Sequence, residues 1–280
     1  MKRLTLIGLV LFIALRVDAQ NPPLSSYWDQ LPRLEFSQSF KSSNLPVKVD
    51  NSLRGFFPPV FLQFGWSCNQ SSSLGYILTY EINALHNRVA SDPANQMAPH
   101  FPWNMLNGGI PKAGASYFDS WEIVKDIGCA SAKDFNSNNS AKKWMTGYSK
   151  YYRAMQNKID EVYAIDVGSP EGLLSLKHWL YDHGDGRNNG GLANFQIGSG
   201  GMVLDTLATG TEDAGKLILT RFGTHVGHAM TFVGYNDSVR HDVNGDGRYT
   251  NDVDITYDGV IDLRDWEIGA LVCVNTYGIN

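Results

Sequence analysis

Apolar residues recur at steps of three and four along several stretches of the chain, which is the spacing of one buried helix face. The first stretch begins after Cys68 and fades near Asn87, and its apolar positions are Leu74, Ile77, Leu78, Ile82 and Leu85. Ser67 precedes this pattern and is a suitable N-cap residue. Cys68 is therefore expected in the first turn of a helix, where unpaired backbone N–H groups and the helix dipole favour a thiolate near neutral pH.

Three further helices are expected. One runs from Tyr117 to a terminating Gly128, and another covers roughly residues 142–163. The third begins at Ser169-Pro170-Glu171, which supplies a cap, a first-turn proline and a first-turn acid, and it continues to Gly184. Residues 92–114 are rich in Pro, Asn and Gly and are expected to form a loop.

The pattern changes in the second half of the chain. Residues 192–197, 228–235 and 268–275 are short, β-branched or aromatic, and bounded by glycine or acidic turns, as strands are. A helical half followed by a half of strands predicts an α+β fold with two subdomains and a cleft between them. We expect a helical subdomain over residues 56–168 and a β-rich subdomain over residues 169–280.

The N-terminus has the three parts of a secretory signal peptide. Met1-Lys2-Arg3 is followed by a mostly apolar run from Leu4 to Leu15 and then by Val17-Asp18-Ala19. The run is short for a transmembrane span. We expect residues 1–19 to be removed by cleavage after Ala19, giving a secreted or periplasmic protein without stable membrane insertion. Residues 20–55 are polar and contain prolines, and we expect an extended segment there.

Composition and charge limit the possible partners. The 280 residues are 43% hydrophobic and 18% charged, as in an ordinary globular protein. A net charge of −5 without a clustered Lys/Arg run argues against a nucleic-acid partner. Polypeptides or small molecules are better candidates, and no organic cofactor is expected.

The chain has three cysteines, so at least one is unpaired if it is exported to an oxidising compartment. Cys68 could be that free thiol. Cys129 and Cys273 could form a disulfide, but Cys273 lies in an apolar strand-like run, so a plain core role is at least as good an interpretation.

Three residue types complete the chemistry that a cysteine nucleophile needs: a base, a group that orients the base, and donors for an oxyanion. His228 opens the second expected strand and Asn275 closes the third. The amide oxygen of Asn275 could accept from one imidazole nitrogen of His228 and leave the other nitrogen facing sulfur. The backbone N–H of Cys68 and the side-chain amide of Gln63 would hold the oxyanion.

These residues resemble those of the papain-like cysteine peptidases, in which a glutamine, a cysteine at a helix start, a histidine and an asparagine occur in this order. The resemblance runs from about Phe56 onward and includes His228-Ala-x-x-x-Val-Gly-Tyr. It implies a papain-like two-subdomain fold, polypeptide substrates, and catalytic roles for Cys68, His228, Asn275 and Gln63. Asn107-Gly108-Gly109 is similar to the family's glycine edge of the substrate cleft, which implies that Gly108 and Gly109 bind substrate.

The chain departs from the family pattern near the nucleophile and near its end. Asn69 follows Cys68 where the family usually has tryptophan, and Gln63 stands five residues before Cys68, one fewer than usual. Tyr277 replaces the tryptophan that usually follows the asparagine, and only five residues follow Asn275. Two alternatives therefore stay open: a calcium-stabilised binding protein of this fold without turnover, and a cysteine acyltransferase of similar fold.

Two acidic loops lie between the strands of His228 and Asn275, with a spacing typical of calcium sites. Gly247 and Gly259 occupy the sixth places, where a sharp turn is needed. Val253 stands at the twelfth place of the first loop, so Asp252 or Asp254 would have to close it. The expected ligands are Asp242, Asn244 and Asp246 in the first loop and Asp254, Thr256, Asp258, Asp262 and Asp265 in the second.

The two loops resemble EF-hand or dockerin calcium loops without the flanking helices of an EF-hand. We expect structural calcium in an insertion at residues 240–266 that ties the two catalytic strands together. An acidic, solvated hairpin is the alternative.

Overall fold

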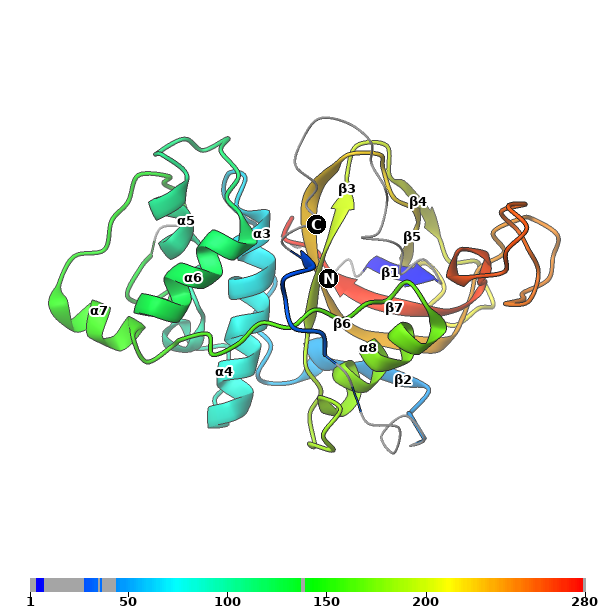
Figure 1. Cartoon of the computed structure of the whole chain (residues 1–280), viewed down its shortest axis with the longest axis horizontal. Coiled ribbons are helices and arrows are strands. Elements are labelled where there is room, and N and C mark those ends of the chain that lie inside the picture. Colours follow the sequence, from blue (N-terminus) through cyan, green and yellow to red (C-terminus); the bar gives the residue numbers. More distant parts are fainter. Residues whose placement is uncertain (1–3, 8–27, 35, 37–43, 137–138, 279–280) are drawn as a thin grey trace.

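The computed structural model describes residues 4–7, 28–34, 36, 44–136 and 139–278. A helical half and a β-sheet half lie side by side (Figure 1). The helices are α3 (Cys68–Gln70), α4 (Thr79–His86), α5 (His100–Leu106), α6 (Tyr117–Ile127), α7 (Tyr148–Ala154) and α8 (Pro170–Asp182). The strands are β1 (Leu4–Ile7), β2 (Lys48–Asp50), β3 (Ala193–Gly198), β4 (Val203–Thr206), β5 (Leu217–Arg221), β6 (Val226–Arg240) and β7 (Ile268–Val274). The predicted α+β fold is confirmed.

The helix that begins at Cys68 continues to His86 and is buried on two sides. Between α3 and α4, Ser71–Leu78 form a wider π-helical segment. Leu74 and Leu78 pack toward α6, while Tyr76 and Tyr80 pack against Val233 and Val272 of the sheet. The helix therefore joins the two halves, and its first residue, Cys68, lies beside both. Leu85, expected on the buried face, is 75% exposed.

The sheet brings two distant segments together at one end of its strands. Its order is β2-β6-β7-β1-β5-β4, and β3 also pairs with β6. β6 and β7 are antiparallel, with Thr231 opposite Val274 and Phe232 opposite Cys273. The beginning of β6 and the end of β7 therefore meet, which places His228 beside Asn275.

One face of the sheet is covered by α8, as Figure 1 shows. Leu176 and Leu180 of α8 pack with Phe195, Phe232 and other sheet residues, and the two phenylalanine rings stack with centroids 3.8 Å apart. Ser169 caps α8 as predicted, since its hydroxyl accepts from the backbone N–H of Gly172 at 3.1 Å. This packing covers β3 and β6, the strand pair that carries His228.

Two expectations about the helical half were wrong. Residues 92–114, expected as a loop, contain α5. Pro102 does not prevent this helix because it lies in the first turn, where a backbone N–H is not needed. The helix expected over residues 142–163 is reduced to α7. Asn104 donates to the backbone carbonyls of Ser140 and Lys143, and Tyr151 donates to that of Met145. These carbonyls therefore have hydrogen-bond donors without a helix. β2, β4 and β5 had no matching prediction.

The described part of residues 20–55 runs from the helical half to the sheet. Trp28 packs edge-on against Tyr117, Phe118 and Trp121 of α6, and β2 pairs with β6. The expected signal peptide, residues 1–19, lies outside the described residues apart from β1. This strand lies between β7 and β5. Among the described residues, no helix is long and apolar enough to cross a membrane.

Candidate active site

The turn before Cys68 is fixed by its neighbours. Gly65 has φ +65°, and a side chain there would lie 2.4 Å from the carbonyl oxygen of Pro111. The backbone N–H of Trp66 donates to the same oxygen at 2.9 Å. Ser67 is the N-cap residue, but its hydroxyl donates to the carbonyl of Phe64 at 2.9 Å and makes no cap hydrogen bond. The glycine and the backbone contacts, rather than a serine cap, therefore present Cys68 at the helix start.

A buried histidine supports this turn from behind. His100 of α5 is 4% exposed, and its Nε2 lies 3.2 Å from the Ser67 hydroxyl and 3.3 Å from the Phe64 carbonyl oxygen. Burial lowers the pKa of His100 to about 4, so its imidazole is neutral. Ser67 is fully buried, so this Ser–His contact supports the turn and cannot act on a substrate.

His228 and Asn275 are joined as predicted. His228 Nε2 donates to Asn275 Oδ1 at 2.8 Å, and the backbone N–H of Thr276 donates to the same oxygen at 2.7 Å. Tyr277 stacks on the imidazole, with ring centroids 4.5 Å apart and planes inclined by 19°. The ring covers the histidine, as tryptophan is expected to do at this place. The Nδ1 atom of His228 is thereby left as the nitrogen that can accept a proton.

Cys68 lies against the strand that carries His228. Cys68 packs in one cluster with Ala229, the residue after His228, and the backbone N–H groups of Ala229 and Asn69 act on the thiol to lower its pKa. Burial outweighs these donors and raises the pKa of the thiol. Burial also lowers the pKa of His228, against the opposing hydrogen bond to Asn275. Burial thus acts against the expected thiolate and favours a neutral thiol and a neutral imidazole, and a thiolate near neutral pH stays a prediction.

Gln63 contacts the residues that directly follow β7. Its backbone N–H donates to the carbonyl of Thr276 at 2.8 Å, and its side-chain oxygen accepts from the Thr276 hydroxyl. Its Nε2 donates to the carbonyl of Gly65 at 2.9 Å. Because an amide nitrogen carries two hydrogens, one N–H beyond this bond can serve an oxyanion. Gln70, the other glutamine nearby, is buried and donates to Ala115, Ser116 and Ser120.

Asn69 connects the two halves directly beside the nucleophile, a role that the sequence did not indicate. Its Nδ2 donates to the carbonyl of Ala115 at 2.9 Å, in the loop before α6. Its Oδ1 accepts from Gln196 Nε2 of β3 at 3.1 Å. Gln196 pairs with Ala229 across β3 and β6. The residue after Cys68 therefore links the helical half to the strand pair that holds His228.

Gly108 and Gly109 follow α5. Both have positive φ, of 61° and 76°, and the Asn107 side chain accepts from the backbone N–H of Gly109 at 2.6 Å. The next residues, through Pro111 and Ala115, are bound to the turn and helix start at Trp66 and Asn69. The loop that carries the two glycines is thus fixed to the nucleophile turn, and their role in binding substrate stays a prediction.

The acidic loops connect β6 to β7 as predicted, without flanking helices, and lie at the end of the molecule opposite α7 (Figure 1). In each loop the first carboxylate accepts from the backbone N–H at the sixth place: Asp242 from Gly247 and Asp254 from Gly259, both at 2.8 Å. Glu267, fully buried, accepts from Val243 and Thr250 and closes the first loop in place of Asp252 or Asp254.

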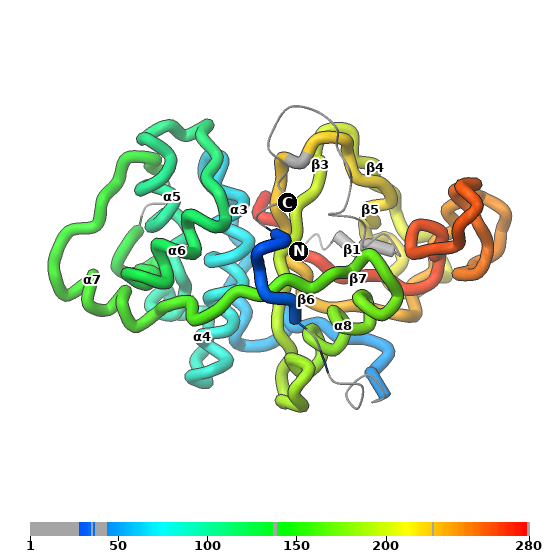
Figure 2. The backbone as a smooth tube through the Cα atoms, viewed as in Figure 1, coloured from blue at the N-terminus to red at the C-terminus, as the bar shows by residue number. Residues whose placement is uncertain are grey.

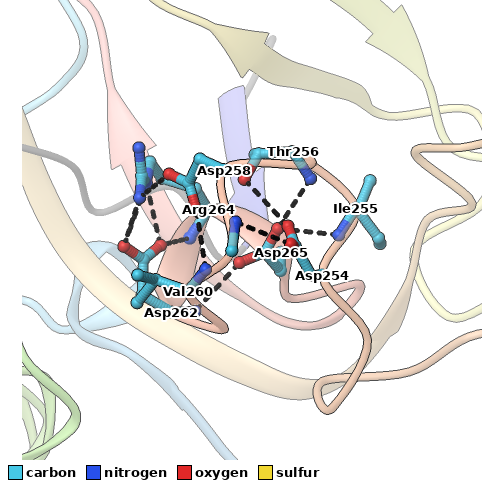
Figure 3. A network of polar contacts seen from close by, with 9 residues as sticks. Asp254, Ile255, Thr256, Asp258, Val260, Asp262, Arg264 and Asp265 are labelled. Carbon is cyan, nitrogen blue, oxygen red and sulfur yellow. Dashed lines mark hydrogen bonds and ion pairs between the residues drawn. The ribbon is translucent and has the colours of Figure 1, made fainter.

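The second loop satisfies its own carboxylates (Figure 3). Asp265 is fully buried and accepts from the backbone N–H groups of Ile255, Thr256 and Asp262. Burial acts to raise the pKa of Asp265, but these donors outweigh it and the pKa is lowered. Arg264 pairs with both Asp258 and Asp262. Within the described chain, no three Asp, Glu, His or Cys side chains converge as a metal site would require, so the expected ligands are not assembled around one point.

The other two cysteines belong to the core. Cys129 packs in the cluster around α6, and Cys273 packs in the cluster between α8 and the sheet. No bond joins their sulfurs, so the disulfide alternative is wrong and the core role holds.

No protein-family profile and no curated protein sequence matches this chain. Among solved structures, xylellain, a cysteine protease from Xylella fastidiosa, is 15% identical over 90% of this chain and 93% of its own, with a TM-score of 0.46. The recombinant stem bromelain precursor is 11% identical over 88% of this chain and 64% of its own, with a TM-score of 0.48. Procathepsin L 3 from Tenebrio molitor larval midgut is 13% identical over 74% of this chain and 60% of its own, with a TM-score of 0.42. At these identities and TM-scores no residue role is carried over to this chain.

Proposed function

We propose that this protein is a cysteine peptidase that hydrolyses polypeptides through an acyl-enzyme on Cys68. The observation that carries the proposal is the 2.8 Å hydrogen bond between His228 and Asn275 beside the stacked Tyr277 ring. The residue after His228, Ala229, packs in one cluster with Cys68. A thiol, a base and an orienting amide thus come together from three separate parts of the chain.

In this proposal, His228 Nδ1 takes the thiol proton as the Cys68 sulfur attacks a peptide carbonyl carbon. The oxyanion is bound by the backbone N–H of Cys68 and by the Gln63 amide. The imidazolium then gives its proton to the leaving amine, and the C–N bond breaks. Water, deprotonated by His228, attacks the thioester, releases the carboxylic acid and restores the thiol.

The neutral resting pair fits this cycle. Because burial raises the pKa of Cys68 and lowers that of His228, proton transfer accompanies attack and does not precede substrate binding. The Asn275 amide oxygen accepts from His228 Nε2–H, so Nδ1 is the unprotonated nitrogen and can act as the base.

The departures from the family pattern do not favour the inactive alternative. Tyr277 covers His228, and Asn69 has two hydrogen-bond partners, in the loop before α6 and on β3. The peptidase proposal is therefore preferred to a binding protein without turnover. An acyltransferase would use the same acyl-enzyme and differ in its acceptor, an amine or alcohol in place of water.

The test is cleavage of casein by the reduced protein, followed on gels and by mass spectrometry of the products. We expect Cys68→Ala to abolish cleavage, His228→Ala and Asn275→Ala to reduce it, and alkylation of Cys68 to stop it in step with labelling. Inactivity of the wild type, or full activity of Cys68→Ala, would overturn the proposal. Transfer of the acyl group to added hydroxylamine in preference to water would favour the acyltransferase.

We also propose that the second acidic loop binds structural calcium. Its oxygen donors suit this cation, but here Arg264 and backbone N–H groups satisfy them, so calcium would have to replace Arg264 at Asp258 and Asp262. Calcium should raise the melting temperature, and Arg264→Gln should tighten binding measured by titration calorimetry. Equal melting temperatures with calcium and with chelator would refute the proposal.

Export after cleavage behind Ala19 is proposed from the sequence pattern of residues 1–19. Such cleavage would remove β1 from its place between β7 and β5. N-terminal sequencing of the mature protein decides this: a chain beginning at Gln20 supports export, and one beginning at Met1 contradicts it.

A further inference from the structure

The net charge of −5 conceals an uneven distribution. Residues 135–159 contain five basic residues and no Asp or Glu. The basic residues are Lys142, Lys143, Lys150, Arg153 and Lys158. Residues 242–265, by contrast, contain seven Asp and two Arg, and they lie at the opposite end of the molecule from α7 (Figure 2). Residues 135–159 are therefore a locally basic stretch, with Asp134 on one side and Asp160-Glu161 on the other.

Most of this positive charge faces solvent without a carboxylate partner. Lys142, Lys143 and Lys158 are exposed, and Lys150 is half-buried. Of the five basic residues, only Arg153 pairs with a carboxylate among the described residues, that of Asp134 at 2.7 Å. Lys143 donates to the Asn136 carbonyl, whereas Lys150 donates to the Asp134 carbonyl and its charge helps to lower the pKa of the Asp134 carboxyl. The segment is thus a positive surface and not a network of ion pairs.

Large aromatic side chains stand among these lysines. Trp144 is 60% exposed, Tyr148 85% and Tyr152 57%. The Tyr148 and Tyr152 rings stack, with centroids 6.5 Å apart and planes inclined by 22°. Exposed aromatic side chains near basic ones are typical of a binding surface, because aromatic rings supply contact area at low entropic cost.

This surface begins at the proposed edge of the substrate cleft. Asn104 of α5 donates to the backbone carbonyls of Ser140 and Lys143, at 3.0 and 2.9 Å. Lys142 lies over Gly109, where an added methyl group would meet its Cγ at 3.2 Å. A chain bound along Gly109 would therefore meet Lys142, the first basic residue of this stretch.

We propose that this basic aromatic surface, formed by Lys142, Lys143, Trp144, Tyr148, Lys150 and Tyr152, binds acidic segments of polypeptide substrates. The inference rests on the proposed peptidase function and names its substrate class. Continuity with Gly109 favours a polypeptide, since a membrane or a nucleic acid would use the surface independently of the cleft. Positive charge on one side of the site also speeds the encounter with acidic chains and weakens with salt.

The test compares quenched fluorescent peptides that share one cleavable core and carry a run of glutamates or of glutamines on one side of it. We expect the glutamate peptide to be cleaved with about three- to tenfold higher kcat/KM at low salt, through KM, and the advantage to disappear at high salt. Lys142→Glu/Lys143→Glu should remove the advantage. Arg88→Glu/Lys125→Glu, with the same change of charge elsewhere on the helical half, should keep it.

Binding is measured separately from turnover. The Cys68→Ala protein is titrated with the labelled glutamate and glutamine peptides, and anisotropy and tryptophan fluorescence are followed. Tighter binding of the glutamate peptide, lost in Lys142→Glu/Lys143→Glu, supports the proposal even if no peptide is cleaved, in which case the peptidase function alone fails. Equal binding of both peptides overturns it, as does preferential binding of phosphatidylserine vesicles or of single-stranded DNA. Salt-sensitive self-association through the acidic loops of a second copy would overturn it as well.

Discussion

Asn69 offers the most direct test of how the site is positioned. Its side chain bonds Ala115 on the helical half and Gln196 on the sheet, at 2.9 and 3.1 Å. Asn69→Ala removes both bonds. Ala115 keeps a donor, Gln70 Nε2 at 3.2 Å, and the half-buried Gln196 can be rehydrated. The Ala115 carbonyl and the Gln196 amide thus keep a donor or gain water, so the free energy of unfolding should fall by only about 1–2 kcal/mol.

The catalytic cost should exceed what this loss of stability suggests. Without the link, the Cys68 turn loses its direct side-chain connection to β3, and the next connection to β6 is the bond from Thr231 to the Ser72 carbonyl at 3.1 Å. A displacement on the order of 1 Å between nucleophile and base can cost about a hundredfold in rate. We therefore expect Asn69→Ala to lower kcat by about ten- to a hundredfold, with KM nearly unchanged because no substrate contact is removed.

The assay is a double-mutant cycle over Asn69→Ala, Gln196→Ala and the double variant, with kcat, KM and unfolding free energy measured for each. The shared hydrogen bond predicts a coupling of about 0.5–1.5 kcal/mol in both unfolding and kcat. Asn95→Ala is the matched control, since the Asn95 side chain donates to the Val89 carbonyl at 3.0 Å, within the helical half. Unchanged kcat in Asn69→Ala, or strictly additive effects with Gln196→Ala, would refute the positioning role.

Three further predictions concern the ring, the buried histidine and the pH profile. Tyr277→Ala removes the ring stacked 4.5 Å from His228 and should lower kcat/KM by about 0.5–1.5 kcal/mol. Tyr277→Phe keeps a ring and should stay near the wild-type kcat/KM. Equal losses of kcat/KM in the two variants would contradict this. Below pH 6.5 the unfolded chain protonates at His100 while the folded chain, with a pKa of about 4, does not. The free energy of unfolding should therefore fall by roughly 3 kcal/mol toward pH 4. The urea midpoint of His100→Gln should depend less on pH than that of the wild type, and an equal pH dependence would contradict this. Because the pKa of His228 is lowered and that of Cys68 is raised, the plateau of kcat/KM should extend below pH 6.5 and above pH 9.0. Asn275→Ala removes the bond that opposes the lowering at His228, so the acidic limb of the profile should move to still lower pH. A plateau that lies inside pH 6.5–9.0 would contradict the neutral pair.

The parts that sequence could predict are those with local signals. A helical apolar stripe placed Cys68 at a helix start, and strand patterns placed His228 and Asn275 at strand ends. The antiparallel pairing of β6 and β7 then brings these two residues together although 47 positions separate them.

Other features depend on contacts that no local pattern encodes. Gln196 lies 127 positions from Asn69, and Glu267 closes a loop that begins at Asp242. His100 had no neighbouring motif, and it supports the Cys68 turn only because α5 packs behind it. The effect of burial on the Cys68 pKa was missed for the same reason: a helix start is visible in sequence, whereas the burial that acts against a thiolate is a property of the assembled halves.

The central claim, that Cys68 is the nucleophile, is tested most directly by trapping its acyl-enzyme. The reduced protein is mixed with a p-nitrophenyl ester of a blocked amino acid, the nitrophenol burst is recorded, and the acid-quenched protein is analysed by peptide mass spectrometry. We expect a burst equal to the concentration of active protein, and the acyl mass on the peptide that contains Cys68, with neither seen in Cys68→Ala. A full burst in Cys68→Ala, or an acyl group on another residue of the wild type, would contradict the account.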